Sequence, residues 1–343
     1  MIHIDSKESP LHQGDHLTPD DRLQRLFEQS KAKARYMESQ ILLESNATRS
    51  VNPDVVRFPV VYDLRSFYVA MVGLGSDQTW LQCEGASKTF KQDMPLYPAR
   101  SSTTFRIVPC KTHPLCTGDR CALDGDCTYK LAYGGGSVTY GVIAEEKFTL
   151  GSDADGTIGH GGQEIRTTPF LVPKLFKTSL YYLNLEDISI GKTRIVFPRG
   201  TFELTSRGTG SCIIDSGTPL SMMYRGHFDE VENLVKAHFD ELGVEYIGKI
   251  HSYEVCFRLP GKFDTANFPW ITLHFQRADY VISDYRANFV MRDFETACLA
   301  IFPKDTDTGP FILGAYQQVN KRILHNIIDQ SLSFADEYCE LGS

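Results

Sequence analysis

The pattern of apolar and polar positions predicts a helix near the start of the chain. Thr18 supplies an N-cap hydroxyl, Pro19 suits the first helical position, and the acids that follow lie near the positive end of the helix dipole. Apolar residues then recur at helical spacing, and basic residues gather in the second half of the run. The apolar stripe consists of Leu23, Leu26, Phe27, Ala34 and Met37. We therefore expect an amphipathic helical leader of about two dozen residues, followed by a linker over 51–66.

From Phe67 onward the pattern changes to short β segments separated by turn residues. Strands are expected at 67–72, 128–133, 138–150, 181–190, 271–275 and 280–289. The glycine-rich tetrapeptide 134–137 joins two of them and predicts a hairpin. One helix is expected over 228–242, where the residues on one face are Phe228, Val231, Leu234, Val235, Phe239 and Leu242. Many short strands with few helices predict a mostly β protein.

One stretch, Ser211–Leu220, has the character of a buried strand that runs into a tight turn. Ile213 and Ile214 favour a packed, pleated surface, and Gly217 can adopt backbone angles that other residues avoid. Asp215 would then lie at the tip of a rigid strand, which is a good position for a catalytic acid. Asp-Ser-Gly is also common turn chemistry, and by itself it is more often structural than catalytic.

Composition narrows the classes of function. The 343 residues are enough for two domains, and 42% hydrophobic with 23% charged residues indicates a folded core. A formal net charge of −8 argues against nucleic acid as the main partner, because no basic field is available to neutralise phosphates. No apolar run approaches the roughly 18 residues that span a bilayer, and the first residues lack the basic start and apolar stretch of a signal peptide.

Four of the nine cysteines lie between positions 110 and 127. Such a cluster is typical of disulfides in an exported protein or of a metal site in a cytosolic one. Cys110, His113, Cys116 and Cys121 could be drawn as a zinc site, but the CxxC pairs that would make this signal strong are missing. We favour disulfides, and the odd count leaves at least one thiol without a partner in the chain.

Several segments, taken in order, make the chain resemble the pepsin-like aspartic endopeptidases, most closely their plant nepenthesin-like branch. The first is the leader over 1–35, in which Ile-His-x-Asp-Ser is followed by Ser-Pro-Leu and Leu-Thr-Pro-x-x-Arg-Leu. The others are Trp80–Cys83, Tyr133–Ser137, Ile213–Thr218, Phe311–Gly314 with Gln317 and Gln318, and Leu332–Phe334. Each segment is a weak signal alone, but their shared order is specific and covers nearly the whole chain.

The resemblance implies a mostly β, bilobal acid-protease fold with a central cleft. Residues 1–66 would form a propeptide-like helical leader and linker, typical of a zymogen. Residues 67–166 would form an N-terminal β lobe, incomplete in this chain, that carries the flap. Residues 167–343 would form a C-terminal β lobe that carries Asp215.

The resemblance also assigns site residues. In this family two aspartates, one from each lobe, share one proton because two carboxylates about 3 Å apart cannot both ionise. The ionised carboxylate activates a water, and the protonated one donates to the peptide carbonyl oxygen. Asp215 would be the second-lobe aspartate, with Ser216, Gly217 and Thr218 as active-site support. The flap residues would be Tyr133, Gly134 and Ser137.

The first active-site loop departs from the family pattern. Gly75-Ser76-Asp77 matches the end of that loop, but the Asp-Thr-Gly expected before it is absent. We interpret this as a lost segment, and a second one follows Leu150, where several strands of the N-terminal lobe are expected. Asp77 follows the glycine instead of preceding it, so it is a poor replacement for the missing acid.

By resemblance, the expected disulfides are Cys110–Cys127, Cys116–Cys121 and Cys256–Cys298. The usual partners of Cys83 and Cys339 would lie in the missing segments, and Cys212 is an extra cysteine. Asn46 begins a glycosylation sequon, which matters only if the chain is exported.

We therefore expect the chain to be a member of the aspartic endopeptidase family whose proteolytic activity is impaired or lost. One alternative is a non-catalytic peptide-binding pseudoprotease, and another is an incomplete reading frame of an active protease. No metal and no cofactor are implied. The expected partners are polypeptide substrates or peptide ligands, with no nucleic acid and no membrane span, and the chain should be a monomer. The resemblance places it in the extracellular apoplast or the vacuole.

Overall fold

The structure is a computed structural model, and the residues that it describes are 18–46, 83–86, 96–110, 116, 121–132, 138–146, 164–173, 180–292, 295–306, 309–326 and 329–336. The chain forms two compact units. The first consists of residues 1–17 and 48–157, and the second of residues 18–47 and 158–343. The leader segment after residue 17 therefore groups with the second unit. Most regular elements are strands, which confirms the expected mostly β class.

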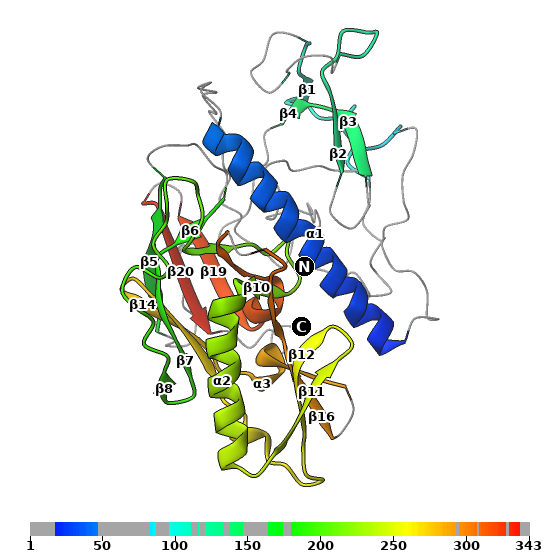
Figure 1. Ribbon diagram of the computed structural model, residues 1–343. Helices are drawn as coiled ribbons and strands as arrows, with labels where there is room; N and C mark the ends of the chain where they lie inside the picture. The colour runs from blue at the N-terminus through cyan, green and yellow to red at the C-terminus, as the bar shows by residue number, and fades with distance from the viewer. Residues whose placement is uncertain are drawn as a thin grey trace. The chain divides into compact units, whose positions relative to one another are not determined.

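The leader helix is present as α1, Pro19–Asn46 (Figure 1). Its start is fixed by a reciprocal cap: the Thr18 hydroxyl accepts from the Asp21 N–H at 3.1 Å, and the Thr18 N–H donates to the Asp21 carboxylate at 3.0 Å. Its buried side chains recur at helical spacing and are Leu26, Ser30, Ala34, Met37 and Ile41. The amphipathic helix expected from the sequence is confirmed, and Asn46 is its last residue.

The described strands of the first unit form two small antiparallel pairs. β1 (Arg106–Ile107) pairs with β4 (Ala144–Glu145), and β2 (Thr128–Ala132) pairs with β3 (Val138–Val142). The second pair confirms the expected hairpin in its arms, while its tip lies outside the described residues. The strand expected at 67–72 also lies outside them. The small core of this unit, as far as it is described, centres on Val108, Cys116 and Cys127.

Two disulfides of the first unit differ from those that the resemblance implied. Cys110 is bonded to Cys121 and Cys116 to Cys127, with Cα–Cα distances of 5.6 and 5.7 Å. The expected pairs Cys110–Cys127 and Cys116–Cys121 are therefore wrong. All four sulfur atoms lie close together, since the Cys110 and Cys116 sulfurs are only 3.6 Å apart although they are not bonded. The pairing is selected by the local path of the backbone, which the sequence spacing does not reveal.

The second unit is built on an eight-stranded sheet in the order β17-β10-β18-β9-β6-β5-β20-β19. In the same order, the strands are Ile301–Pro303, Ser221–Met223, Phe311–Leu313, Cys212–Ile214, Tyr182–Leu183, Arg166–Leu171, Ser331–Asp336 and Lys321–Asn326. β9 lies inside this sheet, parallel to β18 and antiparallel to β6. Its residues are fully buried, as the Cys-Ile-Ile sequence predicts.

Two four-stranded sheets complete the unit. One has the order β14-β13-β7-β8, with bounds Ala278–Ile282, Ile271–Phe275, Leu185–Ile190 and Thr193–Arg194. The other has the order β11-β12-β16-β15, with bounds Glu245–Ile250, Tyr253–Arg258, Thr296–Leu299 and Phe289–Met291. The expected Cys256–Cys298 disulfide is present and joins residues that face each other across β12 and β16.

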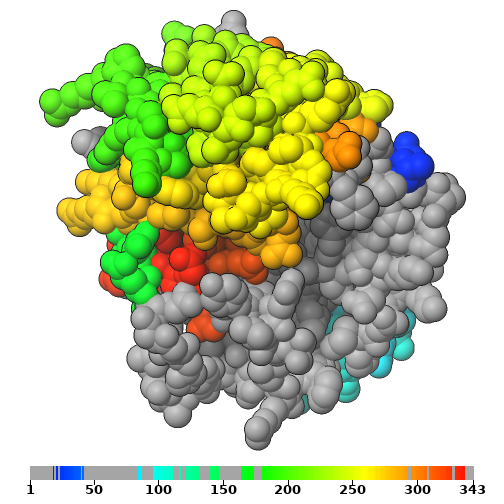
Figure 2. All heavy atoms as spheres, turned by 90° about the horizontal axis from the view of Figure 1, so that it is seen from below, coloured from blue at the N-terminus to red at the C-terminus, as the bar shows by residue number. Residues whose placement is uncertain are grey.

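The helix expected over 228–242 is α2, Arg225–Glu241, and it packs through Phe228, Val231, Val235 and Phe239. The Phe239 ring is 4.3 Å from that of Phe257, measured between centroids, so an aromatic cluster anchors the helix to β12. Figure 2 shows the surface of α2 beside that of the β11–β12 hairpin. Leu242, expected on the buried face, lies beyond the helix end and is exposed.

The strand expected over 280–289 ends early. β14 stops at Ile282, and Asp284 then caps the short helix α3 (Tyr285–Asn288) by accepting from the Arg286 N–H at 3.0 Å. A side-chain acceptor at an N-cap favours a helical turn over continued extension, so the apolar run was misread as one strand. β15 begins only at Phe289.

Candidate functional site

Asp215 follows β9 directly, where the strand leaves the middle of the eight-stranded sheet. Its N–H donates to the Leu313 carbonyl of β18 at 3.0 Å, so the backbone is held by the sheet up to the acid itself. The residue is only 6% exposed. The structure thus places this carboxylate at a rigid strand end, as the sequence predicts.

Both carboxylate oxygens of Asp215 accept hydrogen bonds from the turn that follows. The Gly217 N–H donates to Oδ1 at 2.9 Å, and the Thr218 hydroxyl donates to Oδ2 at 2.6 Å. Thr218 is fully buried, so its hydroxyl has a fixed direction. Ser216, which we expected to support the acid, donates instead to the Gln318 side-chain oxygen at 2.8 Å. The turn orients the carboxylate through Gly217 and Thr218.

The segment after β18 clamps this turn from the other side. The Ala315 N–H donates to the Thr218 carbonyl at 2.8 Å, and the Gly314 N–H donates to the Ser221 hydroxyl at 2.9 Å. A Cβ atom on Gly314 would lie 2.8 Å from the Thr218 carbonyl oxygen, so only glycine allows this approach. Buried Gln317, in the 3-10 turn η2 (Ala315–Gln318), completes the clamp by accepting from the Ser221 N–H at 3.3 Å.

These supporting roles were not predicted for Gly314, Gln317 and Gln318, although all three belong to a segment that carried the family resemblance. Their contacts join positions about a hundred residues apart in sequence, such as Ser221 with Gln317. The feature of the sequence that could have indicated these roles is a Gly-x-x-Gln-Gln motif after a buried strand.

The remaining predicted site residues lie outside the described part of the chain. These are the flap residues Tyr133, Gly134 and Ser137, together with the whole of the first loop, including Asp77. The triplet Asp307-Thr308-Gly309 has the expected Asp-Thr-Gly sequence, but it lies between β17 and β18 of the second unit.

A carboxylate held in this way can accept or donate one proton. Peptide hydrolysis by water needs both a base for the water and an acid for the carbonyl oxygen at the same step. Asp215, held by Gly217 and Thr218, can supply one of these two functions at a time. Among the residues that the structure describes, no group of three or more His, Cys, Asp or Glu side chains is arranged to hold a metal ion.

A second polar cluster on the β7–β13–β14 sheet has the connectivity of a Ser-His-Asp triad. The Ser189 hydroxyl lies 2.7 Å from His274 Nε2, and His274 Nδ1 lies 2.7 Å from the Asp279 carboxylate. Ser189 is the next-to-last residue of β7, paired to β13 on one side and β8 on the other, and is 8% exposed. An acyl-transfer site needs N–H groups that are free to bind an oxyanion. Near Ser189, the Ile188 N–H donates to the Asp187 carboxylate at 2.8 Å and the Gly191 N–H donates to the Trp270 carbonyl at 2.8 Å. We interpret this cluster as a cross-strand structural network.

An open cavity of about 510 Å³ lies beside the start of α2, and Asp215 is not among its lining residues. Its walls include Glu203, Thr205 and Thr209 from the loop before β9, together with Tyr224 and His227. The His227 ring packs against Tyr224 at 5.0 Å between centroids. Burial and then the charge of Lys304 lower the pKa of His227, so the imidazole is held in its neutral form at neutral pH.

Comparisons with known proteins give a consistent family signal. Models of the xylanase inhibitor N-terminal and C-terminal regions match residues 63–173 and 180–336. The aspartic proteinase nepenthesin-2 of Nepenthes gracilis is 23% identical over 336 residues, covering 80% of this chain and 75% of that protein. Nepenthesin-1 of the same plant is 23% identical over 405 residues, covering 99% and 89%. The crystal structure of Basic 7S globulin from soybean shares the fold, with a TM-score of 0.50 at 12% identity, covering 76% and 87%.

Proposed function

The chain belongs to the pepsin-like family of plant aspartic proteases, and we propose that it keeps one half of the catalytic machinery while its proteolytic activity is impaired or lost. The observation that carries this proposal is the Asp215 turn, whose carboxylate is held by Gly217 and Thr218 as a two-aspartate site requires. The sequence has no aspartate at the matching position of the first loop. Gly73-Leu74 is followed directly by Gly75-Ser76, with no Asp-Thr-Gly before them. A lone carboxylate cannot act as acid and base at once.

One further fact supports a lost segment. The alignment with nepenthesin-1 extends over 405 positions, more than the 343 residues of this chain, so it contains positions at which this chain has no residue. Loss of one member of a catalytic unit typically lowers kcat by several powers of ten.

The test is cleavage of an acid-denatured protein substrate by the full chain, with and without a statine-type inhibitor. We expect turnover at least about a thousandfold below that of a two-aspartate relative measured in parallel. The matched controls are Asp215→Ala, in the turn, and Asp279→Ala, an acid of the cross-strand network. Inhibitor-sensitive turnover at the relative's rate that Asp215→Ala abolishes and Asp279→Ala leaves intact would overturn the proposal of impairment.

A non-catalytic peptide-binding role is the second candidate, favoured by the full set of hydrogen bonds around the Asp215 turn. Titration of the same peptide-like inhibitor distinguishes it, because binding without turnover supports a pseudoprotease. The incomplete reading frame is tested separately by sequencing the transcript across codons 72–78 and 150–168. An Asp-Thr-Gly there would restore an ordinary two-aspartate protease.

Polypeptides are the proposed substrates or ligands, since the relatives are named as proteinases. We also propose export to the apoplast or vacuole, which the three disulfides favour because such bonds persist in oxidising compartments. Among the helices of the described residues, none is long and apolar enough to cross a membrane. Residues 1–66 are proposed as the leader, with Asn46 as a glycosylation position.

A further inference from the structure

The helix α1 lies outside both segments that the family models match, which begin at residue 63 and end at residue 336. It nevertheless groups with the second unit, more than a hundred residues further along the chain. Its contacts with that unit are apolar, polar and charged, and each type can be followed to named side chains.

The apolar contact is centred on Phe27 and Phe302. Their ring centroids are 5.0 Å apart, and Phe302 also packs against Tyr253 at 5.3 Å. Phe302 is fully buried on β17, at the edge of the eight-stranded sheet. Loss of the helix would expose part of the apolar Phe302 ring to water, which is unfavourable.

A buried hydrogen bond links the helix to the chain that carries Asp215. The Leu220 N–H donates to the Ser30 hydroxyl at 2.9 Å, and that hydroxyl donates to the Leu26 carbonyl of its own helix at 2.8 Å. Ser30 and Leu220 are fully buried. Without α1, the Leu220 N–H would lose this acceptor two residues after Thr218, and an unpaired buried donor is costly.

The charged contact is centred on Lys304, which directly follows β17. Its ammonium group is 2.8 Å from the Glu38 carboxylate, which also accepts from the Thr306 hydroxyl at 2.8 Å. The Lys304 side chain is 2% exposed and that of Glu38 is 14% exposed. Burial lowers the pKa of Lys304, and the Glu38 charge and hydrogen bond oppose this shift.

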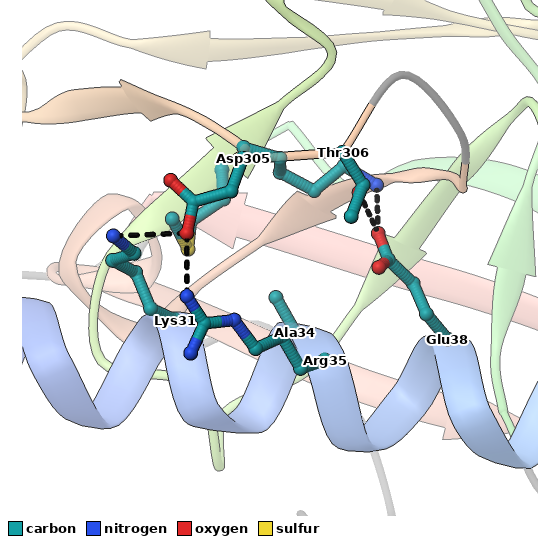
Figure 3. A pocket seen from close by; sticks show the side chains of 8 residues that line it. Lys31, Ala34, Arg35, Glu38, Asp305 and Thr306 are labelled. Atoms are coloured by element: carbon teal, nitrogen blue, oxygen red, sulfur yellow. Dashed lines mark hydrogen bonds and ion pairs between the residues drawn. The ribbon is translucent and has the colours of Figure 1, made fainter.

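A second, more exposed bridge lies one turn away. Lys31 and Arg35 both contact the Asp305 carboxylate, at 2.9 and 2.7 Å (Figure 3). The cavity enclosed by these residues, Ala34 and Met222 is only about 10 Å³, which leaves room for about one water molecule. The helix and the sheet edge therefore fit closely.

From this geometry we propose that the second unit carries a binding surface for one amphipathic helix, that residues 18–46 occupy it, and that the Lys304–Glu38 pair selects this helix. The helix then remains bound as a non-covalent partner when the chain behind it is cut. A helix held in place only by its covalent connection would instead be released once that connection is broken. The proposal does not depend on catalysis, and its test uses no activity measurement.

The test inserts a site for a sequence-specific protease between Thr48 and Arg49 of the full chain. No cysteine precedes Cys83, so no disulfide can hold the released fragment. After cutting at neutral pH, we expect fragment 1–48 to co-elute with the remainder in gel filtration at micromolar concentration. Hydrogen exchange at Leu220 should be as slow in the cut protein as in the uncut one.

Two variants examine selectivity. Glu38→Ala removes the carboxylate that faces the buried Lys304 ammonium group, and we expect binding of the fragment to weaken about a hundredfold or more. Glu28→Ala removes an acid from the exposed face of the same helix and should leave the fragment bound. If circular dichroism shows that the uncut Glu38→Ala protein does not fold, the Glu38→Gln protein is cut instead. This variant keeps a neutral acceptor, and we expect it still to weaken binding of the fragment.

Separation of the wild-type fragment at neutral pH would overturn the proposed surface. Equal retention of the Glu28→Ala fragment and of the Glu38→Ala (or Glu38→Gln) fragment would overturn the selective role of the Lys304–Glu38 pair. If the proposal of impaired proteolysis is overturned, the results on the binding surface and on the Lys304–Glu38 pair still stand.

Discussion

At the scale of single residues, the orientation of Asp215 depends on neighbours that bring no chemistry of their own. Gly314 is the clearest case, because the Leu220 carbonyl carbon, the Thr218 carbonyl oxygen and the Ser221 nitrogen lie 2.7, 2.8 and 2.9 Å from the place of a Cβ. All three are backbone atoms, so they cannot rotate away as a side chain would. The glycine is needed for space, since its φ of −82° is open to any residue.

We therefore predict that Gly314→Ala lowers the free energy of unfolding by about 2 to 3 kcal/mol, since overpacking forces the turn and β18 apart. The measurement is urea denaturation of both proteins. Gly261→Ala is the matched control, because nothing lies within 4 Å of its Cβ position, and it should change stability by no more than about 0.5 kcal/mol. Equal stability of the two variants would contradict the close approach.

The burial of His325 predicts how the free energy of unfolding changes with pH. Its ring lies against Tyr181 at 4.7 Å and Phe170 at 5.9 Å, and burial lowers its pKa from 6.5 to about 4. The unfolded chain binds the proton first as the pH falls, so stability is full above about 6.5 and is lost as the pH falls toward 4. The contribution of this group is on the order of 3 kcal/mol.

The measurement is urea denaturation at neutral pH and near pH 4 for the wild type and His325→Phe, which keeps an aromatic ring without a titrating group. We expect the variant to lose less stability on acidification than the wild type. His251→Asn, at an exposed histidine with a positive φ of 52°, should follow the wild type. The same acid sensitivity in all three proteins would show that burial of His325 does not control it.

At the scale of elements, the sequence predicts structure where the determining contacts are local. The Thr18 cap and the spacing of Leu26, Ala34 and Met37 define α1, and apolar periodicity defines α2. The run over 280–289 was misassigned because the cap at Asp284 outweighs its apolar character. Contacts that no local pattern encodes, such as Ser30 with Leu220, were not predictable, because they join positions 190 residues apart.

The cysteine pairing belongs to the same scale and is open to direct test. Digestion with trypsin and a protease that cleaves before aspartate separates all four cysteines, since Lys111, Arg120, Asp124 and Asp126 lie between them. We expect the peptide of Cys110 to be linked to Cys121 and that of Cys116 to Cys127 by mass spectrometry. Links of Cys110 to Cys127 and Cys116 to Cys121 would instead restore the pairing that the family resemblance implied.

At the scale of the whole molecule, the two units differ in what stabilises them. The second unit has a continuous core that includes Phe228, Phe239, Phe257 and Phe289, and its described residues include the Cys256–Cys298 disulfide. The described core of the first unit consists of Val108 and half-cystines, held by two disulfides. The described part of the first unit buries little apolar surface beyond these half-cystines, so we expect it to depend more strongly on covalent links, which restrict the unfolded state.

This difference predicts two unfolding transitions in calorimetry, one for each unit. A reductant should affect mainly the transition of the first unit. With the disulfides intact, both units should unfold cooperatively, and reduction should abolish the transition of the first unit, since each bond contributes about 2 to 4 kcal/mol. The second unit should unfold at a lower temperature after reduction yet keep its transition, because its aromatic core remains. The double variant Cys256→Ala and Cys298→Ala separates the contributions of the disulfides of the two units. It should shift only the transition of the second unit. A single transition that reductant abolishes entirely would mean that the units fold as one, and that the small disulfide-linked core also supports the sheet that carries Asp215.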